Sequence, residues 1–165
     1  MNKTVQLGYT LLEVLIALLV FSIGLLGLAA MLVSAVKGNH QAYHHSQAIY
    51  VAEAIADGMR ANLAAVGAGA YNTGGLIYSH DGSSCTACAP NQIAARDLGS
   101  WTEMANSRLP NGAISINCTN SAFATIPVAA SYQGVCTINV GWSEVGDTGQ
   151  TQESSQRVFS WMVQP

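Results

Sequence analysis

The strongest pattern along the chain is an uninterrupted run of apolar positions near its N-terminus. Residues 14–36 read VLIALLVFSIGLLGLAAMLVSAV, and no formal charge occurs between Glu13 and Lys37. An apolar stretch of roughly 20 residues is long enough to cross a bilayer as a helix. The run lacks proline, and it exceeds the apolar core of about 7–15 residues in a secretory signal peptide. The pattern therefore predicts a membrane-spanning helix.

Helical spacing continues beyond this run. Apolar residues recur three and four positions apart and predict one buried helical face: Ala48, Ala52, Ile55, Met59, Leu63 and Val66. The intervening polar residues are expected on the solvated face: Glu53, Asp57, Arg60 and Asn62. We therefore expect one helix over residues 9–65 that stops near Gly67.

Strand-like alternation appears only in the last third of the chain. It predicts strands at 113–118, 135–142 and 157–163, with Phe159, Trp161 and Val163 on the buried face. Residues 67–112 are rich in Gly, Ala, Asn and Ser, and we expect them to be loop-rich. The order of elements predicts an α+β chain in which an antiparallel sheet covers the amphipathic part of the helix.

Composition and charge exclude several classes of protein. The chain has 165 residues, which suits one ordinary domain, and only 9% of them are charged. A disordered chain and an ordinary cytosolic globule are both poor fits to this composition. The net charge is −3, and residues 67–165 contain only Arg96, Arg108 and Arg157 as basic residues. A nucleic-acid partner is therefore not expected.

The residues before the apolar run carry a specific motif. The string G-Y-T-L-L-E-V-L-I-A-L-L-V, from Gly8, resembles the class III signal of type IV prepilins and type II secretion pseudopilins. The resemblance implies that prepilin peptidase cuts between Gly8 and Tyr9 and methylates the new amine of Tyr9. It also implies that Glu13 pairs with the N-terminal amine of a neighbouring subunit during assembly. Tyr9 replaces the usual phenylalanine, which is a conservative departure.

Two further segments narrow the resemblance. S-I-G-L-L-G-L-A-A-M (22–31) and A-I-A-D-G-M-R-A-N (54–62) resemble the PilV family of minor pilins, the type IV pilus modification proteins. The family implies a pilin-like fold, a priming role in pilus assembly at or near the filament tip, and other minor pilins and the major pilin as partners. It implies an inner-membrane location before assembly and an extracellular filament afterwards.

The same resemblance divides the chain. It implies a leader over residues 1–8, a membrane and filament-core helix over 9–37, its amphipathic continuation over 38–66, and a periplasmic head over 67–165. Two other functions remain open. One is a minor pseudopilin of a type II secretion system, which has the same kind of N-terminus. The other is a tip adhesin or receptor that binds through the segment 67–112.

Four cysteines fit an oxidising compartment. We favour a Cys118–Cys136 disulfide, because both residues lie on the apolar face of neighbouring predicted strands, and Cys85–Cys88 then pair by default. The Cys85-Thr-Ala-Cys88 spacing also occurs in thiol–disulfide enzymes, but no strand–helix context lowers a thiol pKa here. Zinc binding by the four cysteines is a weaker alternative, since Cys118 and Cys136 are not a CxxC pair.

Other candidate chemistry is sparse. His40 and His44 are four residues apart on the helix, but no third metal ligand is identifiable, and we interpret them as polar residues at the membrane boundary. Trp101 follows Gly99-Ser100 and is our candidate for a partner contact. We expect no catalytic residue, no cofactor and no metal, and therefore not an enzyme.

Overall fold

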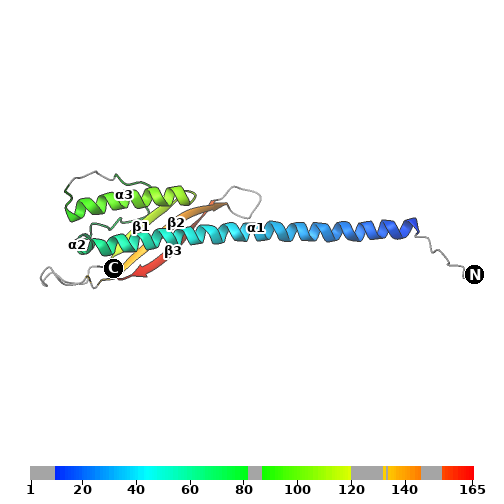
Figure 1. Cartoon of the computed structure of the whole chain (residues 1–165), viewed down its shortest axis with the longest axis horizontal. Coiled ribbons are helices and arrows are strands. Elements are labelled where there is room, and N and C mark those ends of the chain that lie inside the picture. The colour runs from blue at the N-terminus through cyan, green and yellow to red at the C-terminus, as the bar shows by residue number, and fades with distance from the viewer. Residues whose placement is uncertain (1–9, 82–86, 120–131, 133, 146–153) are drawn as a thin grey trace, which may run out of the picture. The chain divides into compact units, whose positions relative to one another are not determined.

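A computed structural model of the chain describes residues 10–81, 87–119, 132, 134–145 and 154–165. These residues form three helices and three strands in the order α1, α2, α3, β1, β2 and β3 (Figure 1). The chain divides into two compact units, residues 1–42 and residues 43–165. Helix α1 (Leu11–Ala61) begins in the first unit and ends in the second.

Within the first unit, α1 is a continuous helix with no buried face. Every residue from Leu11 to Ala42 is exposed. Ser22 satisfies its hydroxyl inside the helix by donating to the carbonyl of Leu18 at 2.7 Å. By length and composition α1 is able to cross a membrane.

Helix α1 ends earlier than the sequence predicted. The helix reaches Ala61, and a five-residue helix, α2 (Leu63–Gly67), follows it. Asn62 interrupts the two with φ −137° and ψ 55°, outside the helical region. Its side-chain amide donates to Tyr71 and to the carbonyl of Pro90, so tertiary hydrogen bonds hold this residue out of the helix.

The predicted amphipathic face is confirmed with small changes. Ala48, Ala52, Ile55 and Met59 are fully buried, and Val51 and Ala56 widen the same face. Leu63 is only half-buried. The expected solvated residues Glu53, Asp57 and Arg60 are exposed, whereas Asn62 is buried, so its prediction as a surface residue was wrong.

The sheet has three antiparallel strands in the order β1-β2-β3. They are β1 (Ala113–Cys118), β2 (Cys136–Val145) and β3 (Ser154–Val163). The first strand coincides with its prediction, and the other two extend further at the ends that face each other along the chain. The register pairs Ile116 with Ile138 and Ile138 with Trp161. Alternation of apolar and polar side chains gives the sheet one core face.

Residues predicted as loop-rich contain a helix. Helix α3 (Pro90–Arg108) spans 19 residues within the 67–112 segment, which corrects that prediction. Proline occupies its first position, where the missing amide costs nothing, and the Ala89 amide donates to the side chain of Gln92 at 3.0 Å. Its buried residues recur at helical spacing: Ala94, Leu98, Trp101, Thr102 and Ala105.

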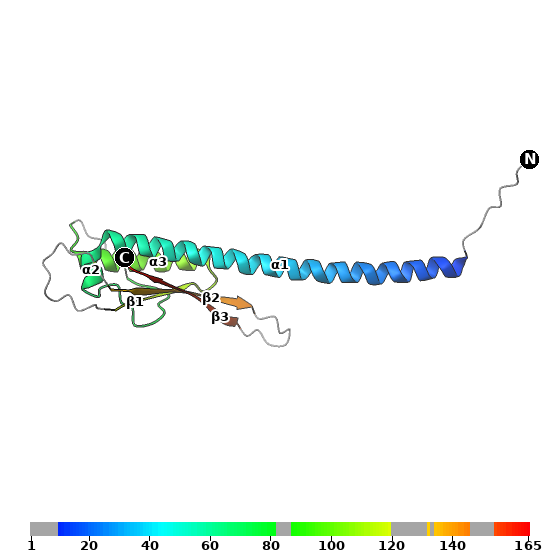
Figure 2. The same cartoon turned by 90° about the horizontal axis from the view of Figure 1, so that it is seen from below.

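The core of the second unit lies between two helices and one face of the sheet. Figures 1 and 2 show α3 and the last part of α1 on the same face of the three strands. The buried cluster joins Ile55 and Met59 of α1, Leu98 of α3 and Ile138 of β2. The chain therefore has the pilin-like α+β architecture that the resemblance implied, with a long apolar N-terminal helix and a small antiparallel sheet.

Candidate assembly site

The described part of the N-terminal motif begins at Thr10. Gly8 and Tyr9, the residues of the expected cleavage and methylation site, lie outside the described residues. Glu13 lies in the first turn of α1. A negative side chain in this position interacts favourably with the positive end of the helix dipole.

Thr10 caps the start of this helix. The amide of Glu13 donates to the carbonyl of Thr10 at 3.1 Å and to its hydroxyl oxygen at 3.3 Å. The first turn otherwise leaves such amides without intrahelical acceptors. This role of Thr10 was not among the sequence predictions, although Thr10-Leu-Leu-Glu13 has the Thr-x-x-Glu spacing of a capping box before an apolar run. The cap starts the helix immediately after the motif and holds the Glu13 backbone in the first turn.

The apolar surface that follows is too large for a solitary soluble protein. Leu11 is 87% exposed, and every large apolar side chain from there to Val36 is exposed. Continuous apolar patches of this size mark surfaces that contact membrane or protein. The site is therefore one carboxylate in the first turn of a helix that has apolar residues on every side.

Two histidines near the end of the apolar run contact aromatic rings. Among the described residues, no three His, Cys, Asp or Glu side chains are close enough to share a metal ion. The rings of His44 and Tyr43 meet edge to face at 5.8 Å, and His45 meets Phe159 in the same way at 5.4 Å. Two of the three histidines near the end of the apolar run thus make aromatic contacts.

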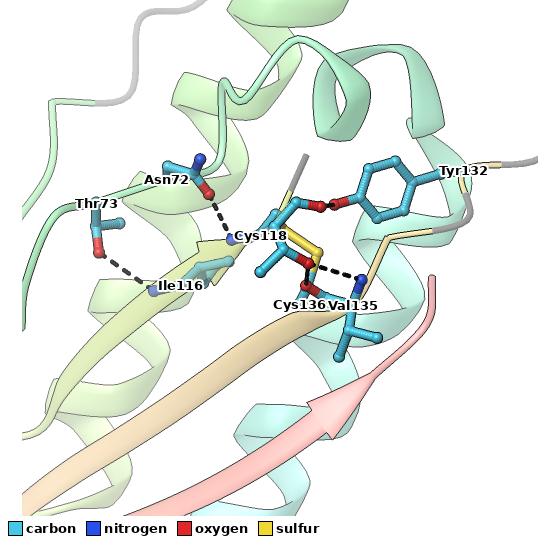
Figure 3. Close-up of a disulfide and its surroundings, with 8 residues drawn as sticks. Asn72, Thr73, Ile116, Cys118, Tyr132, Val135 and Cys136 are labelled. Atoms are coloured by element: carbon cyan, nitrogen blue, oxygen red, sulfur yellow. Dashed lines mark hydrogen bonds between the residues drawn. A yellow bond between two sulfur atoms is a disulfide. The ribbon is translucent and has the colours of Figure 1, made fainter. Parts of the chain in front are cut away.

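Cys118 and Cys136 form a disulfide at the end of the sheet (Figure 3). The two residues are directly opposite each other in the β1–β2 register. Asn72 supports this end of β1, because its side-chain oxygen accepts the Cys118 amide at 2.7 Å. The bond joins the pair that we favoured from the alternation of the strands.

The chain beside the disulfide forms a compact stem. The Thr119 amide donates to the carbonyl of Val135 at 2.9 Å, and the Val135 amide donates to the Thr119 hydroxyl at 3.2 Å. Tyr132 donates its hydroxyl to the Thr119 carbonyl at 2.6 Å (Figure 3). Burial raises the pKa of the Tyr132 phenol above its ordinary value. These hydrogen bonds and the disulfide together join the end of β1 to the residues just before β2.

The second expected disulfide is only partly within the described residues. Cys85 lies outside them, while Cys88 is disulfide-bonded and is not a free thiol. The Cys85–Cys88 pairing therefore stays a prediction, as does the absence of thiol–disulfide chemistry.

Trp101 is a core residue, which corrects its interpretation as a partner contact. Its side chain is only 5% exposed, and its ring stacks on Tyr71 with centroids 5.4 Å apart. Tyr71 is fully buried, accepts a hydrogen bond from Asn62 at 3.2 Å and donates to Asp97 at 2.8 Å. Burial first, and then the bond to Asp97, raise the pKa of Tyr71 well above its ordinary range. This network ties the end of α1 to α3.

Comparison with known proteins identifies the N-terminal signal. A family model described as the prokaryotic N-terminal methylation motif matches residues 3–29, which include Gly8, Tyr9 and Glu13. Comparison with curated proteins and with solved structures gives no match. The chain thus carries a prepilin-type signal on a pilin-like fold, and its membrane anchoring before assembly follows from that signal and the apolar helix.

Proposed function

We propose that this protein is a PilV-like minor pilin that helps to prime type IV pilus assembly at or near the filament tip. One combination of observations carries the proposal. The methylation motif spans residues 3–29, and α1 begins within it with Glu13 in the first turn and a fully exposed apolar surface behind it. A membrane anchor needs no acid at that depth, where an unpaired carboxylate is costly.

The first step is processing at the cytoplasmic face of the inner membrane. Prepilin peptidase removes residues 1–8 by cutting between Gly8 and Tyr9 and methylates the Tyr9 amine. Glycine before the cut lets the enzyme approach the backbone without a side chain. The products are a short leader and a subunit whose positively charged N-terminus, at Tyr9, is four residues before Glu13.

The second step is assembly through charge pairing and helix packing. The carboxylate of Glu13 binds the methylated amine of a neighbouring subunit within the apolar core of the growing filament. Breaking such a buried pair by removing one partner leaves an uncompensated charge, so the pair selects the register of the two helices. The apolar residues from Leu11 to Val36 then lose their contacts with lipid and pack against neighbouring helices. The protein acts without catalysis or a cofactor.

The head supports the PilV-like identity. The segment 54–62, which carries the narrower resemblance, contains Gly58 and Asn62, and both residues serve the contact between α1 and α3. This segment is therefore the part of the chain that packs against α3 of the head. The domain limits follow from the same proposal: leader 1–8, core helix 9–37, amphipathic helix 38–66 and periplasmic head 67–165.

A deletion strain complemented with wild type, Glu13→Ala or Glu53→Ala tests the proposal. Glu53 is also an exposed glutamate of α1 and serves as the matched control. Sheared surface pili and secreted enzymes are measured in the same culture. We expect pili to be lost in the deletion strain and with Glu13→Ala, restored by wild type and Glu53→Ala, and secretion to stay normal. Lost secretion with normal pili would instead make the protein a minor pseudopilin. Normal values of both would leave adhesion by the head as the remaining function.

A further inference from the structure

The two edges of the sheet differ in how far their backbone groups are paired. Residues 72–77 run beside β1. The amides of Thr73 and Ile77 donate to the carbonyls of Ile116 at 3.0 Å and Ile114 at 2.8 Å, and the Ile114 amide donates back to Ile77. Helix α3 also packs beside β1. The outer backbone groups along this strand are therefore paired within the chain.

At the other edge, the described residues provide no such cover. All ten residues of β3 pair with β2, and no described residue pairs with the opposite edge of β3. Figure 1 shows β3 on the side of the sheet away from α3. The strand contains neither proline nor lysine, and its one charge, Arg157, is bound to Glu144 at 3.1 Å. Proteins usually protect a free edge with such residues or cover it.

The core face of the sheet extends onto β3, where its side chains are only partly covered. Phe159 lies opposite Val140, and Trp161 lies opposite Ile138. Both β2 residues are fully buried, whereas Phe159 and Trp161 remain partly exposed although they pack against the same core. Two aromatic side chains thus present apolar surface along this edge.

The outer face of the same strand carries two exposed apolar side chains among polar ones. Val158 is 50% exposed and Met162 is 72% exposed. They flank Ser160, whose hydroxyl bonds to Asn139 on the neighbouring strand. A strand added beside β3 would meet apolar side chains on both faces and a row of backbone donors and acceptors between them.

We infer that the free edge of β3 binds an extended segment of a different subunit in the same assembly, which adds a fourth strand to the sheet. Only another extended backbone matches the hydrogen-bonding groups of a strand edge. Alternate side chains of the added segment would be apolar and would cover Phe159 and Trp161. The inference rests on the proposed function, because assembly is what brings a second head beside this one.

A second copy of this chain fits the edge less well. Antiparallel pairing of two β3 strands relates the copies by a two-fold axis, as isologous contacts do. That axis reverses the direction of residues 43–61 of α1 in one copy relative to the other. Subunits taken from one membrane have their N-termini on the same side, so their helices run in the same direction. Antiparallel pairing of two copies is therefore incompatible with a common helix direction, and we take a different subunit as the partner of this edge.

Photo-crosslinking in piliated cells tests the inference with the full chain. A photoreactive amino acid replaces Ser160 on β3 or, as the control, Glu103 on the exposed face of α3. We expect an adduct with another pilin-like subunit from position 160, at least tenfold stronger than from 103, that mass spectrometry maps to an extended segment. Val158→Lys combined with Met162→Lys should reduce that adduct at least tenfold while the head keeps its protease resistance and its Cys118–Cys136 disulfide.

Specific outcomes separate this inference from the proposed function. An adduct of two copies of this chain, or no adduct above the Glu103 level in piliated cells, would overturn the inference. The double lysine variant could also give an unchanged adduct and normal pili while Glu13→Ala abolishes pili. That result would overturn the inference about β3 but would leave the proposed function intact. Loss of the adduct in the lysine variant, with pili unaffected by Glu13→Ala, would support the β3 surface and contradict the proposed function.

Discussion

Gly58 on α1 lies directly against the indole ring of Trp101 on α3, so that a side-chain carbon on Gly58 would overlap ring atom Cζ2. Trp101 is buried and stacked on Tyr71, which restricts its movement. The glycine thus sets how closely the two helices approach. It lies inside a helix, where glycine ordinarily costs stability.

Gly58→Ala should therefore destabilise the head by about 1–3 kcal/mol, as overpacking does in a dense core. An ordinary helical site gives the opposite sign, because alanine favours helix by about 1 kcal/mol over glycine. Gly38→Ala is the control, since nothing lies within 4 Å of the added carbon there. Thermal unfolding of the full chain in detergent compares the two variants. Equal melting temperatures for both variants would contradict the close packing of Gly58 on Trp101.

Tyr71→Phe should lower the free energy of unfolding of the head by about 1–2 kcal/mol. Asp97 then loses the hydrogen bond from the Tyr71 hydroxyl, whereas Asn62 keeps its bond to the carbonyl of Pro90. The same hydroxyl makes stability depend on alkaline pH. The pKa of Tyr71 is raised from 10.0 in the folded state, so this contribution is complete below the unfolded pKa and declines as pH rises above it. Urea unfolding at about pH 8 and about pH 11 should show a smaller decline for Tyr71→Phe than for wild type. An identical decline in both proteins would show that the Tyr71 hydroxyl is not the source of the pH dependence.

Removal of the Cys118–Cys136 disulfide by a double alanine substitution should destabilise the head by about 3 kcal/mol in the chain-entropy model, since it closes a loop between residues 18 apart. The predicted Cys85–Cys88 bond closes a much shorter loop and should contribute about 2 kcal/mol in the same model. Chemical unfolding of both double variants gives the comparison. A smaller loss at Cys118–Cys136 than at Cys85–Cys88 would be inconsistent with this account.

Gly8→Val should block processing, because a β-branched side chain then occupies the position where the peptidase approaches the backbone. The mass of the membrane-bound protein reports whether residues 1–8 remain. Gly24→Val provides the control, since it lies in the apolar run away from the cleavage site and nothing is within 4 Å of the added carbon. Retention of the leader in both variants, or in neither, would argue against cleavage after Gly8.

The elements that could be predicted from sequence are those with strong periodic patterns. The apolar run of α1, its buried stripe at Ile55 and Met59, and the alternation of β1 all follow from side-chain periodicity. The Cys118–Cys136 pairing could be predicted for the same reason, because alternation places both cysteines on one face. The prepilin-type signal was recognisable as a short motif of several coincident residues.

Helix α3 escaped prediction because small side chains make up part of its buried face and weaken the apolar pattern. Ala94 and Ala105 are two of its five buried residues, and Gly99 and Ser100 interrupt the pattern with residues typical of loops. Asn62 was misplaced for a different reason. Its polar side chain is buried only because Tyr71 and Pro90, far along the chain, supply its hydrogen-bonding partners. Tertiary contacts of this kind leave no local signal.

The most direct measurement of the central claim is the chemical state of the N-terminus in purified filaments. Mass spectrometry of sheared pili from a strain that expresses this protein at its natural level identifies its first peptide and any methyl group on it. We expect a peptide that begins at Tyr9, carries an N-methyl group and is absent from sheared material of the Glu13→Ala strain. A first peptide that begins at Met1, or filaments that form normally without this protein, would contradict it.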